Sequence, residues 1–279
     1  MPFDPAWYVP ACILGLVFGS FFNVAIHRWP KEEPKEREWI RTPSRCPKCS
    51  ANIRWYDNIP LLSFILLRGK CRDCSAPISW RYPAIELGAA LLWMLTIYLV
   101  SHFGLSGLDP AQLSMWHYVF AIYFASLLML TVIIDFETGI IPDEISIGFF
   151  AGAWLFIWIC SGQTISEGWL SSLIGMLALS TFFFVFCIFG GMGFGDVKLA
   201  VGLGALFGWK LTIAVAFLGI LLGGVVATAL VVVLLIQRRY RRGIPIPFGP
   251  YIAVSAYICM FFGWSLANWY LSFYPKIGQ

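Results

Sequence analysis

The feature that most constrains the fold is a series of apolar segments long enough to cross a bilayer. A membrane helix needs about 20 mostly apolar residues. Such runs cover residues 9–26, 83–104, 117–135, 145–161, 168–190, 211–236 and 248–273, and a shorter run covers 197–209. The runs lack the alternation of barrel strands, and a helix satisfies its own backbone polar groups in lipid. We therefore predict an all-α polytopic membrane protein with about eight transmembrane helices.

The distribution of charge predicts the orientation of these helices. With only 12% charged residues, the chain concentrates 12 of its 19 Lys and Arg residues between Arg28 and Arg81. A second basic cluster follows the seventh run and consists of Arg238, Arg239, Arg241 and Arg242. By the positive-inside rule both segments are cytoplasmic. With eight spans, the N-terminus and the C-terminus then lie outside.

The segment between the first two helices contains a predicted metal site. Two C-x-x-C pairs, Cys46 with Cys49 and Cys71 with Cys74, are separated by 21 residues. The sequence C-x-x-C-S-A-x-I-x-W occurs at Cys46 and again 25 residues later. Two similar turns facing one ion supply four thiolates for a closed tetrahedral zinc site. Two redox dithiols are the alternative, but no thioredoxin-like pattern surrounds them.

These features predict three parts of the chain. Residues 1–26 form the first transmembrane helix, 27–82 a cytoplasmic zinc-binding insert with four Cys ligands, and 83–279 a seven-helix membrane core. The insert is small and polar, so metal binding is expected to supply much of its stability.

Two aspartates are expected at the cytoplasmic boundary of the core. Asp135 ends the third apolar run, and Asp196 follows the glycine-rich segment 190–195. A helix C-terminus disfavours an anion, so capping does not explain Asp135. Asp196 also suits a helix N-cap, as does Asp143. Two carboxylates held close together share a proton and can act as acid and base, which is the arrangement of aspartic proteases.

Several ordered motifs carry a family resemblance. They are residues 19–28 (GSFFNVAIHR), the four cysteines, 57–60 (DNIP), 67–71 (LRGKC), 81–86 (RYPAIE), 135–143, 193–198 (GFGDVK) and 247–250 (PFGP). With these motifs the chain resembles the bacterial type IV prepilin peptidases, membrane aspartic proteases of the G-x-G-D type. The resemblance implies that Asp135 and Asp196 are the catalytic pair. It also places the 247–250 motif beside the catalytic cleft, although this motif also suits a simple helix entry.

The resemblance further implies the substrates and the reactions. Members cleave the leader of type IV prepilins or type II secretion pseudopilins after a glycine, at the cytoplasmic face of the bacterial inner membrane. Bifunctional members then methylate the new N-terminal residue, usually phenylalanine, with S-adenosylmethionine. The complete four-cysteine insert favours the bifunctional form. Membrane lipid is the other expected partner, and no nucleic-acid partner is expected.

The residues for methyl transfer are less directly indicated. No G-x-G-x-x-G follows a predicted strand. A carboxylate could stabilise the sulfonium cation, and Glu86 and Asp57 are the candidates. A salt bridge from Glu86 to Arg81, and a turn from Asp57 into Pro60, are structural alternatives.

Other functions are also compatible with parts of the pattern. A peptidase-only G-x-G-D intramembrane protease would share the aspartates. A non-enzymatic transporter or scaffold could combine intramembrane carboxylates with a zinc module. A transporter should show inverted repeats with paired broken helices, whereas the cysteine motif is the internal repeat found here.

Overall fold

The computed structural model describes residues 5–31, 44–105, 108–160, 165–190, 192–238 and 247–272. Within these ranges the long elements are all helices, and the β-structure consists of isolated bridges. The chain divides into two compact units, Pro2–Tyr98 and Leu99–Gln279, which are described separately below.

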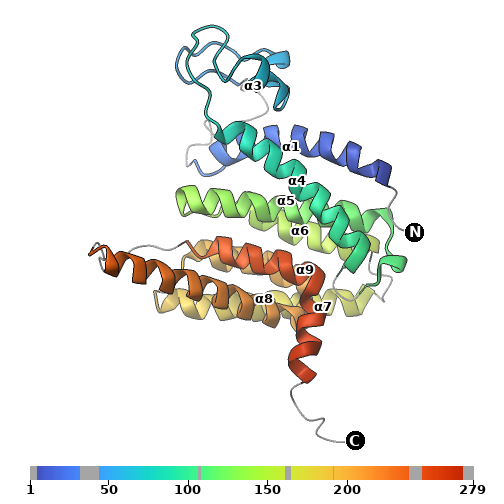
Figure 1. The fold of residues 1–279 in the computed structure, drawn as a ribbon. Coiled ribbons are helices and arrows are strands. Elements are labelled where there is room, and N and C mark those ends of the chain that lie inside the picture. Colours follow the sequence, from blue (N-terminus) through green and yellow to red (C-terminus); the bar gives the residue numbers. More distant parts are fainter. Residues whose placement is uncertain are drawn as a thin grey trace, which may run out of the picture. The chain divides into compact units, whose positions relative to one another are not determined.

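The N-terminal unit contains two long helices and a small insert (Figure 1). The long helices are α1 (Tyr8–Arg28) and α4 (Arg81–Phe103), of which the last residues belong to the other unit. The short elements are the 3-10 helices η1 (Pro5–Trp7) and η2 (Trp55–Asn58) and helix α3 (Leu62–Leu66). Helices α1 and α4 approach closely, because a methyl group added at Gly19 would lie 2.6 Å from the Cα of Glu86. This contact fixes the face of α1 that meets Glu86.

The C-terminal unit is a helical bundle preceded by η3 (Pro110–Gln112). Its long helices are α5 (Met115–Thr138), α6 (Asp143–Cys160), α7 (Ile165–Ile188), α8 (Phe194–Ile236) and α9 (Gly249–Ser272). Helix α5 packs against α6 and α9, and α8 packs against α6, α7 and α9. Phe149, Phe183 and Leu203 are fully buried where these helices meet. The core of the bundle therefore surrounds α8.

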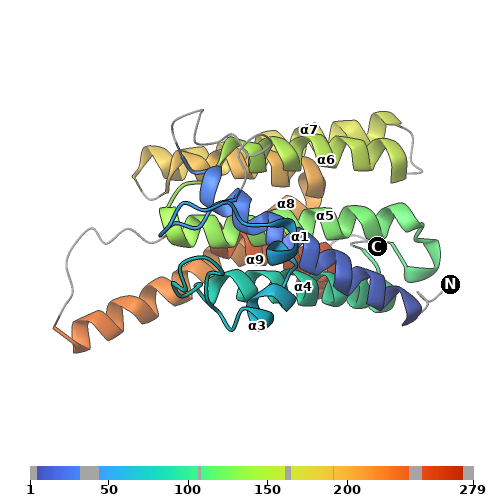
Figure 2. The same cartoon turned by 90° about the horizontal axis from the view of Figure 1, so that it is seen from above.

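Helix α8 is interrupted at Gly208, where φ is 63° and ψ is 179°. The chain turns back at this residue, so the two arms of α8 run in opposite directions (Figures 1 and 2). A straight helix would separate Asp196 from Gly223 by 27 residues, or about 40 Å. Instead, Gly223 packs against Phe248, whose neighbour Gly249 contacts Asp135 at the site described below. The apolar runs 197–209 and 211–236 therefore lie mostly in separate arms.

The predicted all-α membrane class is confirmed. Seven helices in the described chain are long and apolar enough to cross a membrane. The expected count of about eight runs corresponds to these seven helices with α8 in two arms. Arg239, Arg241 and Arg242 of the second basic cluster, and residues 273–279, lie outside the described residues. The predicted division at residue 82 stays a prediction, and the compact units divide after Tyr98.

Candidate functional site

Asp135 lies in the last turn of α5, which ends at Gly139 in a left-handed conformation. Only 5% of Asp135 is exposed. Its Oδ2 atom is buried and has no hydrogen-bond partner among the described residues. A buried carboxylate oxygen without a partner is costly and calls for a functional explanation.

Asp196 lies in the first turn of α8. The backbone N–H of Gly193 donates a hydrogen bond to its Oδ2 atom at 3.2 Å. Gly193 holds the N-cap position, so the N-cap alternative for Asp196 is wrong: the carboxylate reaches back from the third helical residue. Asp196 is 6% exposed. Its hydrogen bond satisfies one of the free amide groups at the helix start.

The structure brings the two aspartates together, as the topology predicted. Both side chains are buried, and they share a neighbour. Ile141, from the loop between α5 and α6, packs against Gly195 on one side and lies close to Gly249 on the other. Two neighbouring buried carboxylates can exchange and share a proton, which is the requirement for acid and base work on a peptide bond.

Lys198 and Asp143 are engaged with each other near this pair. The Lys198 ammonium lies 2.6 Å from Asp143 Oδ1. Asp143 is the first residue of α6, so its predicted N-cap role is replaced by this ion pair. Both side chains are well exposed, at 40% and 61%, so the pair contributes little stability. Lys198 therefore serves α6 rather than either catalytic candidate.

Gly249 is the residue of this site that the sequence pattern did not single out. Its backbone lies against the Asp135 carboxyl group. A methyl group added at Gly249 would lie 2.6 Å from Asp135 Oδ2 and 3.0 Å from Ile141 Cδ1. Only glycine permits this approach. The signal in the sequence was the 247–250 motif, whose expected position beside the aspartates agrees with these contacts.

The cysteine repeat folds as two matching turns in the N-terminal unit. The N–H of Cys46 donates to Ala51 and that of Ser50 to Cys46, and the same bonds recur from Cys71 to Ala76 and from Ser75 to Cys71. Ser50 and Ser75 share a left-handed φ of 59° and 57°. The sequence repeat thus encodes two equivalent backbone knuckles.

The four thiols meet at one point. All four Sγ atoms lie within 4.8 Å of one another, and Cys46 Sγ is 3.9 Å from Cys74 Sγ. Tetrahedral zinc with Zn–S bonds of about 2.3 Å places sulfur atoms roughly 3.8 Å apart, so the donor set fits this ion. The backbone N–H groups of Cys49 and Lys48 point to Cys46 and lower the pKa of its thiol to about 6. This knuckle favours a thiolate.

A cavity of about 400 Å³ in the same unit contains both candidates for methyl transfer on its wall, Glu86 and Asp57. The Glu86 carboxylate accepts the N–H of Leu61 at 2.9 Å. Leu61 has φ 57° and ψ −47°, and the N–H of Leu62 bonds the carbonyl of Pro60. This is a strained γ-turn for a residue other than glycine. Glu86 therefore anchors the strained turn that enters α3.

Asp57 is held differently. Arg72 donates three hydrogen bonds to its two carboxylate oxygens, the shortest at 2.6 Å. These bonds hold the pKa of Asp57 below its usual range. Asp57 thus ties η2 to the second knuckle, and this pairing is a structural role that the sequence did not predict.

Comparison with known proteins identifies the family. Residues 13–100 match the Bacterial Peptidase A24 N-terminal domain, and residues 122–228 match the Type IV leader peptidase family. A Prepilin leader peptidase/N-methyltransferase of Stutzerimonas stutzeri is 35% identical, over 96% of this chain and 95% of that protein. The chain belongs to the type IV leader peptidase family. No solved structure matches significantly.

Other relatives named as prepilin leader peptidases also align with nearly the whole chain. Proteins with the same name from Aeromonas salmonicida (strain A449) and Pseudomonas aeruginosa are each 32% identical. The alignments cover 93% and 96% of this chain and 92% and 94% of those proteins. Its apolar helices and its membership of the type IV leader peptidase family make this a multi-pass protein of the inner membrane.

Proposed function

We propose that this protein removes the leader peptide of type IV prepilins or type II secretion pseudopilins after a glycine, and then methylates the new N-terminal residue. The observation that carries the proposal is the buried pair Asp135 and Asp196, in which Asp135 Oδ2 has no partner among the described residues. The names of the relatives supply the substrate class.

In the proposed cleavage, the pair begins with one shared proton. The ionised carboxylate takes a proton from water as the water oxygen attacks the carbonyl carbon of the scissile bond. The protonated carboxyl gives its proton to the carbonyl oxygen, which produces a neutral tetrahedral diol. Collapse of the diol breaks the C–N bond: the protonated carboxyl gives its proton to the leaving amine, and the ionised carboxylate takes a proton from one diol hydroxyl. The pair returns to its starting state with one proton.

The orientation of the protein follows from charge. The insert and both aspartates face the cytoplasm, and both termini lie outside, because 12 of the 19 Lys and Arg residues lie between Arg28 and Arg81. A prepilin that keeps its basic leader in the cytoplasm then presents the scissile bond at the depth of the aspartates.

One structural zinc ion is proposed for Cys46, Cys49, Cys71 and Cys74. The matched knuckles and the sulfur distances support this assignment. All four positions of the ion are filled by thiolates, so its role is to fold the insert. Because Cys46 and Cys71 also line the 400 Å³ cavity, the zinc would shape that cavity's wall.

S-adenosylmethionine is proposed to bind in this cavity, whose volume lies in the range of about 300 to 1,000 Å³ typical of ligand sites. Bound there, it supplies the methyl group. Glu86 is the better candidate to face its positive sulfonium, because the Asp57 carboxylate is already neutralised by Arg72. Asp57 then has a positioning role: its bonds to Arg72 hold η2 and the second knuckle together in the wall of the cavity.

The test incubates the reconstituted enzyme with a prepilin bearing a Gly-Phe junction and S-adenosylmethionine, and follows leader loss and methyl gain by mass spectrometry. Asp135→Asn and Asp196→Asn should each lower cleavage by at least about a hundredfold, because neither amide can exchange the proton. Glu137→Gln, on the same helix and exposed, is the matched control and should cleave normally.

The outcomes of this test distinguish the proposed enzyme from its alternatives. If either folded asparagine variant cleaves at the wild-type rate, the catalytic pair is wrongly assigned. If the wild type removes the leader but does not methylate a pre-cleaved substrate, the protein is a peptidase only. If the folded wild type does neither with several prepilins, the transporter or scaffold alternative replaces the proposal.

A further inference from the structure

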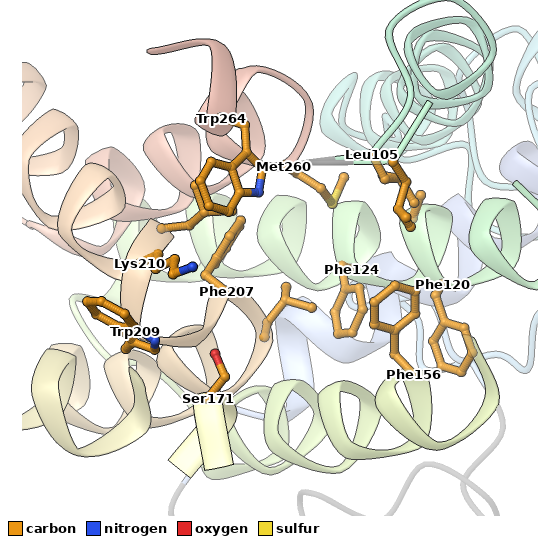
Figure 3. Close-up of a pocket in the computed structure, with 14 residues that line it drawn as sticks. Leu105, Phe120, Phe124, Phe156, Ser171, Phe207, Trp209, Lys210, Met260 and Trp264 are labelled. Atoms are coloured by element: carbon orange, nitrogen blue, oxygen red, sulfur yellow. The ribbon is translucent and has the colours of Figure 1, made fainter. Parts of the chain in front are cut away.

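A second cavity lies within the C-terminal unit and is separate from the aspartate pair. Its volume is about 450 Å³. Figure 3 shows its aromatic lining, to which α5, α6, α8 and α9 contribute. The aromatic and basic part of the lining includes Phe120, Phe124, Phe156, Trp209, Lys210 and Trp264.

The position of this cavity excludes a direct part in peptide cleavage. Phe120 precedes Asp135 by 15 residues on α5, which corresponds to about 22 Å along the helix. Trp209 follows the turn at Gly208, at the far end of the first arm of α8 from Asp196. The cavity and the aspartates therefore occupy opposite ends of these helices.

Lys210 gives the cavity its charge. It is the only charged residue among the cavity's described lining residues. Its Nζ atom lies 5.6 Å from the centre of the Trp209 ring and 5.7 Å from that of Trp264. Figure 3 shows the side chain between these two rings. The ammonium is thus held by cation–π contacts, and no acidic residue in the lining competes for it.

The break in α8 creates this arrangement. Gly208 has a positive φ with extended ψ, a conformation that is essentially restricted to glycine. A side chain at Gly208 would also collide with Ser171 of α7. The break ends the first arm at the cavity, and Trp209 and Lys210 follow at once, both exposed at its edge.

We propose that this cavity binds one acyl chain of an anionic phospholipid, with the lipid phosphate paired to Lys210. The aromatic lining suits a hydrocarbon chain, and the lone cation suits a single negative headgroup. The volume admits one chain rather than a whole diacyl lipid. A small soluble anion would make no use of the phenylalanine rings. An interfacial Trp–Lys anchor alone would explain the position of Lys210 but not the cavity.

The experiment uses the full-length enzyme in neutral phosphatidylcholine nanodiscs. The probes are phosphatidylglycerol and phosphatidylcholine with the same diazirine at the end of one acyl chain. After illumination, chymotryptic peptides are mapped by mass spectrometry, since a change at Lys210 would alter a tryptic map. We expect phosphatidylglycerol to label the 115–131 and 199–211 regions about fivefold more than phosphatidylcholine does.

Variants assign the effect to the cation. Lys210→Gln should reduce phosphatidylglycerol labelling of these regions to the phosphatidylcholine level, and Lys210→Arg should retain it. Arg238→Gln, just past the far end of the second arm of α8, is the matched control and should leave this labelling unchanged. Equal labelling by both lipids, or a Lys210→Gln variant that labels like the wild type, would overturn the proposal. So would label confined to other parts of the chain. None of these results depends on the aspartates.

Discussion

Replacing Gly249 by alanine should slow leader cleavage by about ten- to a hundredfold while the protein stays folded. The added methyl group would lie 2.6 Å from Asp135 Oδ2, whereas ordinary contact begins near 3.4 Å. The carboxylate or the start of α9 must therefore move by about 0.8 Å, and Ile141 Cδ1, at 3.0 Å, restricts the escape of the methyl group. Misplacing a catalytic group by about 1 Å can cost a hundredfold in rate.

The assay separates this displacement from loss of structure. Steady-state cleavage of a prepilin gives kcat and KM, and we expect the loss in kcat. Methylation of pre-cleaved substrate by the same preparation should be normal, because Glu86 belongs to the other unit. Gly224→Ala is the matched control: nothing lies within 4 Å of its added methyl group. In a helix interior this change should be neutral or stabilising by roughly 0.5–1 kcal/mol.

The reasoning fails if Gly249→Ala cleaves at the wild-type rate with an unchanged melting temperature. The close approach to Asp135 would then have no bearing on catalysis. If methylation and the melting temperature fall together with cleavage, the variant has a general folding defect. That result too would contradict the predicted selective effect.

Two further predictions concern the N-terminal unit. Glu86→Gln keeps an oxygen that can accept the Leu61 N–H but removes the charge, so methylation of pre-cleaved substrate should fall at least about tenfold while cleavage persists. Unchanged methylation would exclude Glu86 as the partner of the sulfonium. Wild type should contain one zinc per chain by elemental analysis, and Cys74→Ser should lose it and become sensitive to proteolysis between residues 44 and 80. Full zinc content in this variant would place the metal elsewhere.

Much of the architecture could be predicted from the sequence because it depends on local pattern. Continuous apolar runs predict membrane helices whatever their partners are. The 25-residue cysteine repeat predicts two equivalent knuckles, which the matching hydrogen bonds of Cys46 and Cys71 confirm. Counting spans predicts that Asp135 and Asp196 lie at one depth. The membrane thus restricts the fold enough for topology alone to bring distant residues together.

The remaining features depend on contacts that spacing does not encode. The runs 197–209 and 211–236 indicate two helices, but the turn itself is made by Gly208 against Ser171 of another helix. Asp196 fits an N-cap by sequence, whereas Gly193 takes that position. The strained turn at Leu61 is stabilised by Glu86, 25 residues later in the chain. Each of these details is decided by a tertiary partner.

The surroundings of the aspartates suggest how backbone groups help the site to hold a negative charge. Asp135 belongs to the end of α5, where the helix dipole opposes an anion. Its carboxyl group, however, lies against Gly249, the first residue of α9. Asp196 accepts an N–H at the start of α8. Each carboxyl group therefore meets the positive end of a helix. Asp196 lies within the first turn of α8, and Asp135 lies against the first residue of α9. This arrangement leaves Lys198 available to pair with Asp143, and it explains why glycine is required where α9 meets Asp135.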